Sequence, residues 1–135
     1  MYLIDTCVVS EARRRTPQAV AWLRAARSET LFLSVITIGE ITRGVMMKLR
    51  TDPPTAGVLL RWLDELRFVY SERILPVDDA VATSWGRMMA QRTRPFADAL
   101  IAATAQVHNK VLVTRANSGR LRAAERKVST LVAKY

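Results

Sequence analysis

A chain of 135 residues is long enough for one domain with its own core, and its hydrophobic fraction of 50% excludes an intrinsically disordered protein. Its 21 Lys and Arg against 12 Asp and Glu give a formal charge of +9, which favours a polyanionic partner such as RNA or DNA over a basic surface kept for solubility. The single Cys7 excludes an internal disulfide, and we find no signal peptide and no run of membrane-spanning length, so we expect a cytoplasmic protein.

Short strands alternate with helices along the chain. The first half predicts a strand at 2–4, helices from Thr6 and Pro17, a strand at 31–33, and a helix at 35–49 with Ser34 as its N-cap. The second half predicts a helix from Pro53, a strand at 74–77, a helix capped by Asp78 or Asp79, a basic loop at 92–95, a helix at 96–107 and a strand at 111–113. A loop at 114–119, a basic helix-like stretch and a weak strand at 128–132 follow. This alternation predicts an α/β fold with a small, mostly parallel sheet and helices on both faces.

Three acids lie within or at the end of apolar runs. Asp5 ends Tyr-Leu-Ile-Asp, Glu40 lies in Val-Ile-Thr-Ile-Gly-Glu-Ile, and Asp98 lies in Phe-Ala-Asp-Ala-Leu-Ile. Charged groups rarely enter such environments unless they are paired or bound to a metal. Two unit charges about 4 Å apart repel by roughly 4 kcal/mol at an effective dielectric of about 20. Because a hard divalent cation removes this repulsion, the acids predict a Mg²⁺ site beyond the carboxyl ends of the strands.

Each acid also has a simpler interpretation. Asp98 falls at the start of a predicted helix, where a carboxylate can serve as a cap and interact with the helix dipole. Glu40 is followed by Arg43 and Arg50, and an ion pair with one of them would explain a partly buried acid. For Cys7 we favour a small packed residue over a nucleophile.

The motifs that surround these acids resemble a known family. They are Leu-Ile-Asp-Thr at 3–6, Ser-Val-Ile-Thr-Ile-Gly-Glu-Ile at 34–41, Ile-Leu-Pro-Val-Asp at 74–78 and Asp-Ala-Leu-Ile-Ala-Ala-Thr-Ala at 98–105. Val-Ser-Glu at 9–11, Trp85-Gly86 and Leu-Val-Thr-Arg at 112–115 also match. In this order and spacing the chain resembles PIN-domain ribonucleases, more narrowly the VapC/FitB-type toxins of bacterial toxin–antitoxin pairs. We expect a single PIN-like domain over 1–135, family-like over 1–115 and divergent over 116–135.

The resemblance implies a metal-dependent endoribonuclease that uses Mg²⁺, with Mn²⁺ as a substitute. It implies that Asp5 and Asp98 are the main metal-binding and catalytic acids, that Glu40 is the third, and that Thr6 supports the site through its hydroxyl. The implied partners are an RNA substrate and a VapB-type antitoxin whose tail lies in a groove and offers an arginine to the acids. A homodimer or a toxin–antitoxin hetero-oligomer is expected.

This sequence departs from the family's pattern at two places. Cys7 stands where the family commonly has asparagine, which predicts looser support of Asp5. The family's fourth acid would align near Gly119, but no acid occurs from Thr114 to Arg122. Asn117 could still hold a metal-bound water. We therefore expect one tight metal, a second that is weak or arrives with the substrate, and reduced activity.

Two alternatives follow from these residues. A degenerate PIN domain would bind RNA or antitoxin without efficient cleavage, because the fourth acid is missing. A phosphoacceptor receiver domain is also α/β with an acid pocket, but it needs a pair of acids after the first strand, where Asp5 stands alone.

Basic and apolar residues suggest where partners bind. Arg92, Arg94 and Arg115 fall in or beside loops near the predicted site and are candidates for RNA phosphate contacts, as are Arg13 to Arg15, Arg120 and Arg122. An ordinary solvated surface is the alternative for each arginine. Met46-Met47 and Leu59-Leu60 are candidates for a dimer surface or a groove for the antitoxin's helix.

Overall fold

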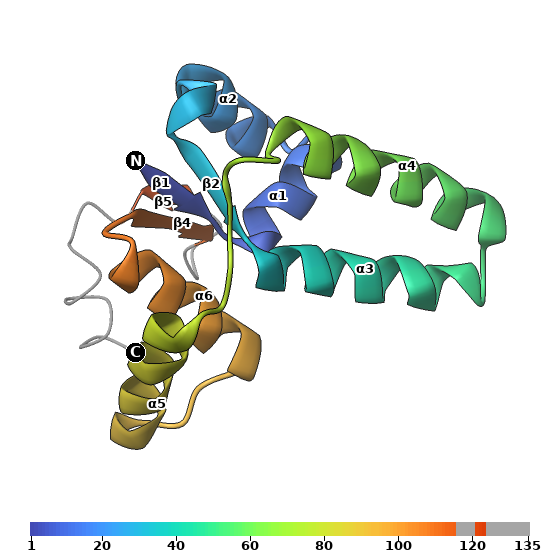
Figure 1. Ribbon diagram of the computed structural model, residues 1–135. Helices are drawn as coiled ribbons and strands as arrows, with labels where there is room; N and C mark the ends of the chain where they lie inside the picture. The colour runs from blue at the N-terminus through green and yellow to red at the C-terminus, as the bar shows by residue number, and fades with distance from the viewer. Residues whose placement is uncertain (116–120, 124–135) are drawn as a thin grey trace.

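The sheet forms the centre of the computed structural model, which describes residues 1–115 and 121–123 (Figure 1). Its five strands, in the order β3-β2-β1-β4-β5, are β1 (Tyr2–Ile4), β2 (Leu31–Ser34), β3 (Ile74–Leu75), β4 (Val111–Arg115) and β5 (Leu121–Ala123). The first four run parallel, and β5 pairs antiparallel with β4. The expected mostly parallel sheet is confirmed.

Among the described residues, six α-helices surround this sheet: α1 (Thr6–Arg13), α2 (Pro17–Ala25), α3 (Val35–Leu49), α4 (Pro53–Val69), α5 (Asp79–Gln91) and α6 (Phe96–Val107). Ser34 and Asp78 begin α3 and α5 as predicted, because each side chain accepts a backbone N–H of the first turn. Figure 1 shows α3 and α4 packed side by side as a pair that projects from the body of the molecule. No helix among residues 1–115 is long and apolar enough to cross a membrane.

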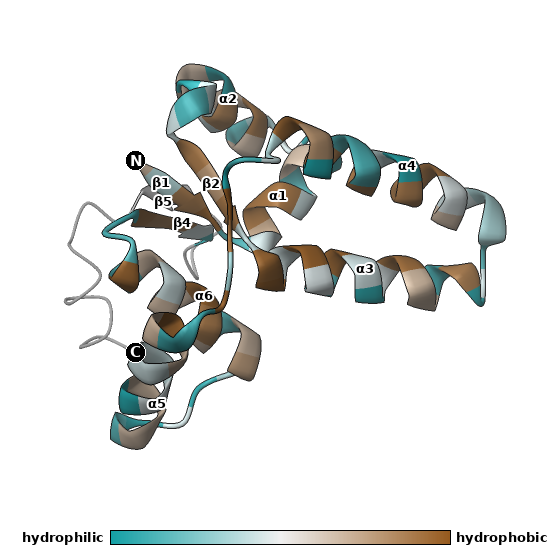
Figure 2. Cartoon of the chain, viewed as in Figure 1, coloured by the Kyte–Doolittle hydropathy of each residue, from teal (hydrophilic) through white to brown (hydrophobic). Residues whose placement is uncertain are grey.

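Alternating strand residues bury apolar side chains on both faces of the sheet. Ile4 and Leu33 pack on one face with residues of α1, α3 and α4, and Trp22 of α2 lies against the same cluster. Leu3 and Leu112 pack on the other face with Ile101 of α6. A third cluster joins α5 to α6. Figure 2 shows hydrophobic residues in the central strands, and hydrophobic residues alternating with hydrophilic ones along α3 and α4. Helices on both faces are thereby confirmed.

The structure differs from the predicted elements at three places. The fourth strand continues to Arg115, where a loop was expected from Thr114, because Thr114 and Arg115 pair with β5. The third strand ends at Leu75, because Pro76 has no N–H for the ladder and Val77 packs with the α5–α6 cluster instead. Residues 121–123 form a strand where a helix-like stretch was expected, because their backbone pairs with the otherwise open edge of β4. The predicted strand at 128–132 lies outside the described residues.

Candidate active site at the carboxyl edge of the sheet

The topology brings several predicted site residues to one edge of the sheet. Asp5 follows β1, and its backbone N–H donates to Val113 of β4 at 2.9 Å, which places it beside Thr114. Glu40 lies on α3, which follows β2, and Asp98 lies in the first turn of α6. Carboxyl ends of parallel strands meet at a common edge, where sites of α/β sheets form.

Three donors hold the carboxylate of Asp5. The backbone N–H of Thr6 donates to Oδ1 at 2.7 Å, so that Asp5 is also the N-cap of α1. The Thr114 hydroxyl donates to Oδ2 at 2.7 Å, and the Cys7 thiol lies 3.5 Å from the same oxygen. Both lone pairs of Oδ2 are thus engaged, whereas Oδ1 keeps one acceptor position. Asp5 therefore has a fixed orientation with one oxygen available to a ligand.

Glu40 is linked to this region through Thr6. The Thr6 hydroxyl donates to Glu40 Oε1 at 2.7 Å and lies 3.0 Å from the hydroxyl of the fully buried Thr37. In residues 1–115, Glu40 forms no ion pair with Arg43 or Arg50. The alternative in which one of these arginines pairs with Glu40 is therefore not supported. Two threonines thus orient a carboxylate that faces solvent.

Asp98 is electrostatically coupled to the other two acids. Partial burial raises its pKa, and the negative charges of Asp5 and Glu40 raise it further. A capping role would instead lower the pKa and would require backbone donors, but the N-cap of α6 is Pro95, and no side chain caps the helix. Asp98 is therefore close enough to both Asp5 and Glu40 to be repelled by them.

This arrangement is suited to a metal ion that keeps much of its water. Within residues 1–115 and 121–123, no three side chains of the His, Cys, Asp and Glu types lie close enough to surround one ion. Mg²⁺ is commonly held by one or two carboxylates together with waters and substrate phosphates. The free Oδ1 position of Asp5 and the repelled carboxyl of Asp98 fit that mode of binding.

Cys7 has the properties of a packed residue. Burial raises the pKa of its thiol, and the nearby charge of Asp5 raises it further. The thiol is partly buried and packs against the cluster that contains Ile4 and Val8. A raised pKa disfavours the thiolate, the form that acts as a nucleophile.

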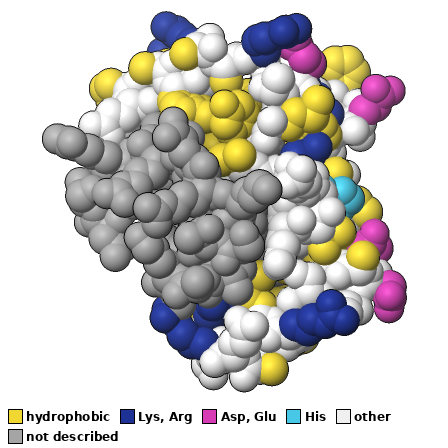
Figure 3. Space-filling model, turned by 90° about the vertical axis from the view of Figure 1, so that its left-hand side faces the viewer, with side chains coloured by type: hydrophobic (Ala, Val, Ile, Leu, Met, Phe, Trp, Pro, Cys, Tyr) yellow, Lys and Arg dark blue, Asp and Glu magenta, His cyan; other side chains and the backbone are white. Residues whose placement is uncertain are grey.

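The candidate RNA-binding arginines have different environments. Arg92 is exposed at the end of α5, and Arg94 is half-buried in the loop that leads to α6. Arg115 forms an ion pair with Glu11, with Nη1 and Oε1 2.8 Å apart. Figure 3 shows Lys and Arg side chains in both the upper and the lower parts of one face. Asn117 lies outside the described residues.

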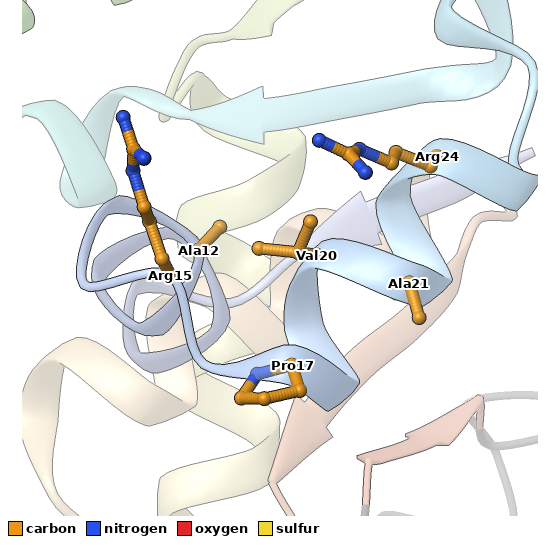
Figure 4. Close-up of a pocket in the computed structure, with 6 residues that line it drawn as sticks. All are labelled: Ala12, Arg15, Pro17, Val20, Ala21 and Arg24. Carbon is orange, nitrogen blue, oxygen red and sulfur yellow. The ribbon is translucent and has the colours of Figure 1, made fainter.

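A separate open pocket lies between α1 and α2 (Figure 4). Its volume is about 700 Å³, and Figure 4 shows Arg15 and Arg24 on opposite sides of the apolar side chains of Ala12 and Val20. Arg15 has a left-handed backbone, with φ of 59°. Among the described residues no acid contributes to the lining. This part of the pocket is therefore positively charged and distinct from the acid cluster formed by Asp5, Glu40 and Asp98.

Sequence reasoning gave no role to two threonines that hold the site together. Thr37 precedes Glu40 by one helical turn, so the helical spacing could have identified it. Thr114 falls in the Leu-Val-Thr-Arg motif, but its contact with Asp5 depends on the pairing of β1 with β4.

Comparisons with known proteins agree with this fold. The family model described as PIN domain matches residues 2–125. Toxin FitB from Neisseria gonorrhoeae is 34% identical over 123 residues, which covers 85% of this chain and 87% of the relative. VapC ribonuclease Y4jK from Sinorhizobium fredii is 33% identical over 125 residues, or 87% of this chain and 89% of the relative. The crystal structure of FitAcB from Neisseria gonorrhoeae superimposes with a TM-score of 0.77 at 34% identity and covers 88% of this chain and 89% of that one.

Proposed function

This chain belongs to the PIN-domain family, and we propose that it is the toxin of a type II toxin–antitoxin system, an endoribonuclease that hydrolyses RNA phosphodiester bonds. The observation that carries the proposal is the cluster of Asp5, Glu40 and Asp98 at the carboxyl edge of the sheet. Two relatives are named as a toxin and as a VapC ribonuclease, which supports the same activity. The family also decides against a phosphoacceptor receiver domain.

Asp5 and Asp98 would hold Mg²⁺, or Mn²⁺ in its place, with Glu40 joining directly or through water. The bound ion supplies charge neutralisation at the phosphate and lowers the pKa of the attacking water. The chain's own residues orient the acids for this task. The Thr114 hydroxyl orients Asp5 by donating to its Oδ2, and the Thr6 hydroxyl orients Glu40 by donating to its Oε1. Loss of a hydrogen bond that orients a metal-binding side chain commonly lowers metal affinity by about 10–100-fold.

Phosphate contacts would come from basic residues near the cluster. Arg92 and Arg94 precede the helix that carries Asp98, and Arg115 follows Thr114 on β4. Asn117 and the position of the missing acid near Gly119 lie outside the described part of the chain. From the sequence alone we predict that Asn117 holds a metal-bound water and that the activity is reduced.

A cognate VapB-type antitoxin and a second copy of the chain are the proposed protein partners. Large apolar side chains are exposed on the α3–α4 pair, which suits an interface: Met46, Met47, Leu49, Val58, Leu60, Phe68 and Val69. Leu59 instead packs against the core and is a poorer candidate than its neighbour. A small reading frame immediately upstream that encodes a DNA-binding protein, and that neutralises this chain on co-expression, would identify the antitoxin.

Cleavage of RNA by the purified protein tests the activity. We expect cleavage with Mg²⁺ or Mn²⁺, inhibition by a chelator, and loss of activity in Asp5→Ala and Asp98→Asn. Asp64→Asn is the matched control, because Asp64 is an exposed acid on α4 whose pair with Arg67 is long, at 3.9 Å. Equal cleavage by Asp98→Asn and the parent protein would contradict the proposal. RNA binding without turnover at any metal concentration would favour a degenerate domain.

A further inference from the structure

One ion pair joins distant parts of the chain beside the acid cluster. Glu11 lies on α1 and Arg115 ends β4, and Nη1 of the arginine is 2.8 Å from Oε1 of the glutamate. The side chain of Glu11 is only 13% exposed, whereas that of Arg115 is 57% exposed. The pair is therefore asymmetric, with a nearly buried acid and a base that is largely open to solvent.

The nearly buried glutamate restricts the position of the arginine side chain. A buried carboxylate without a partner is strongly unfavourable, so Glu11 requires Arg115 to stay in contact. Arg115 in turn uses one of its guanidinium nitrogens for this contact. A guanidinium has five N–H donors in a planar fork that matches phosphate, and the exposed donors remain available. The side-chain entropy that a free arginine loses on binding an anion is thus already lost here.

The backbone of Arg115 is anchored at the acid cluster as well. Thr114, its neighbour in β4, donates to Oδ2 of Asp5 at 2.7 Å. The thiol of Cys7, which contacts Oδ2 of Asp5, lies 3.9 Å from the hydroxyl of the same threonine. The guanidinium therefore extends from a strand end that is attached to the candidate metal-binding acid through Thr114.

We propose that Glu11 is a positioning residue that holds Arg115 ready to bind a phosphate of the RNA next to the bond that is cleaved. The inference rests on the proposed function and adds a residue to which the acid cluster gives no role. The alternative is a structural clip between α1 and β4. A clip would affect the melting temperature and folding, whereas a positioning residue affects RNA affinity and acts only through Arg115.

A double-mutant cycle separates these roles. The variants are Glu11→Gln, which is nearly isosteric, Arg115→Gln, and the two combined. Cleavage assays should show a several-fold higher KM with nearly unchanged kcat in each single variant, and the double variant should be no worse than Arg115→Gln alone. Glu29→Gln is the control, because it removes an exposed ion pair with Arg27 that lies before β2. It should leave KM unchanged.

RNA binding gives a readout that does not require turnover. In an Asp98→Asn background, the slope of log K against log salt should fall in magnitude by about 0.7 for Arg115→Gln, as expected for one lost phosphate contact on a single strand. An unchanged slope, additive effects in the cycle, or equal losses in kcat and melting temperature would overturn the inference and leave the proposed function standing. A parent protein that neither binds nor cleaves RNA would overturn both.

Discussion

Asp98 shows how a proposed metal-binding acid can work against the stability of its own fold. It lies in the first turn of α6 near Asp5 and Glu40, and both negative charges raise its pKa beyond the effect of burial. The charged form is therefore less stable in the folded protein than in the unfolded chain. Such strain persists at functional sites when the surrounding structure maintains it.

The Asp98→Asn variant should be more stable than the parent in metal-free buffer at neutral pH. A folded pKa above the ordinary carboxyl value gives a stabilisation that is complete below about pH 4 and is lost as pH rises through the raised pKa. Asparagine carries no charge, so the variant does not lose this stabilisation as the pH rises. We expect a rise in melting temperature on the order of 2 °C, since solvent screens the site, and no difference near pH 3.

Divalent metal provides the second part of this test. Mn²⁺ should raise the melting temperature of the parent protein and have much less effect on Asp98→Asn, because ligand binding stabilises only a protein that retains its ligands. Asp64→Asn should respond to Mn²⁺ as the parent does. A lower melting temperature for Asp98→Asn in metal-free buffer at pH 7 would show that the acid makes a favourable contact instead.

At the scale of elements, helix starts position the acids. Ser34 is fully buried at the end of β2, and its hydroxyl accepts the backbone N–H of Ile36 at 3.0 Å. This cap sets where α3 begins and hence where Glu40 lies on that helix. Asp52 caps α4 in the same way, but α4 carries none of the three acids.

Ser34→Ala and Asp52→Ala should therefore differ in function more than in stability. Loss of a cap costs about 1 kcal/mol, and each variant should lose stability of that order in urea denaturation. Only Ser34→Ala should also weaken metal binding and RNA cleavage, by several-fold, because it loosens the first turns of the helix that carries Glu40. Equal catalytic losses in both variants would point to general destabilisation.

At the scale of the whole molecule, a strongly basic protein surrounds a small acidic centre. The formal charge of +9 attracts a phosphate backbone at long range, while the three acids locally repel it in the absence of metal. The basic residues are spread over the face in Figure 3. Overall attraction should therefore be general, and productive placement should depend on the few arginines near the acids.

The salt dependence of RNA binding tests whether the arginines near the acids contribute more to binding than other basic residues do. Arg92→Gln combined with Arg94→Gln should reduce the slope of log K against log salt by roughly 1 to 1.5, because each lost phosphate contact on a single strand contributes about 0.7. Arg50→Gln combined with Arg61→Gln removes the same charge from the exposed α3–α4 pair and should change the slope much less. Equal changes would indicate that only net charge governs binding.

The sequence by itself determined the features that depend on neighbours along the chain. Apolar periodicity identified all six α-helices and β1, β2 and β4, and capping residues marked where α3 and α5 begin, because these signals act within a few residues. Apolar runs and family motifs also singled out Asp5, Glu40 and Asp98, which the fold brings within electrostatic reach of one another.

Tertiary structure alone decided how those acids are held. Thr114 reaches Asp5 across 109 residues, and Thr37 lies against Thr6 across 31, contacts that exist only after β1 pairs with β4 and α3 packs on the sheet. The pairing of residues 121–123 with β4 and the ion pair of Glu11 with Arg115 have the same origin. Local propensity carries no information about partners so distant in the chain, because their geometry is fixed by the packing of the whole domain.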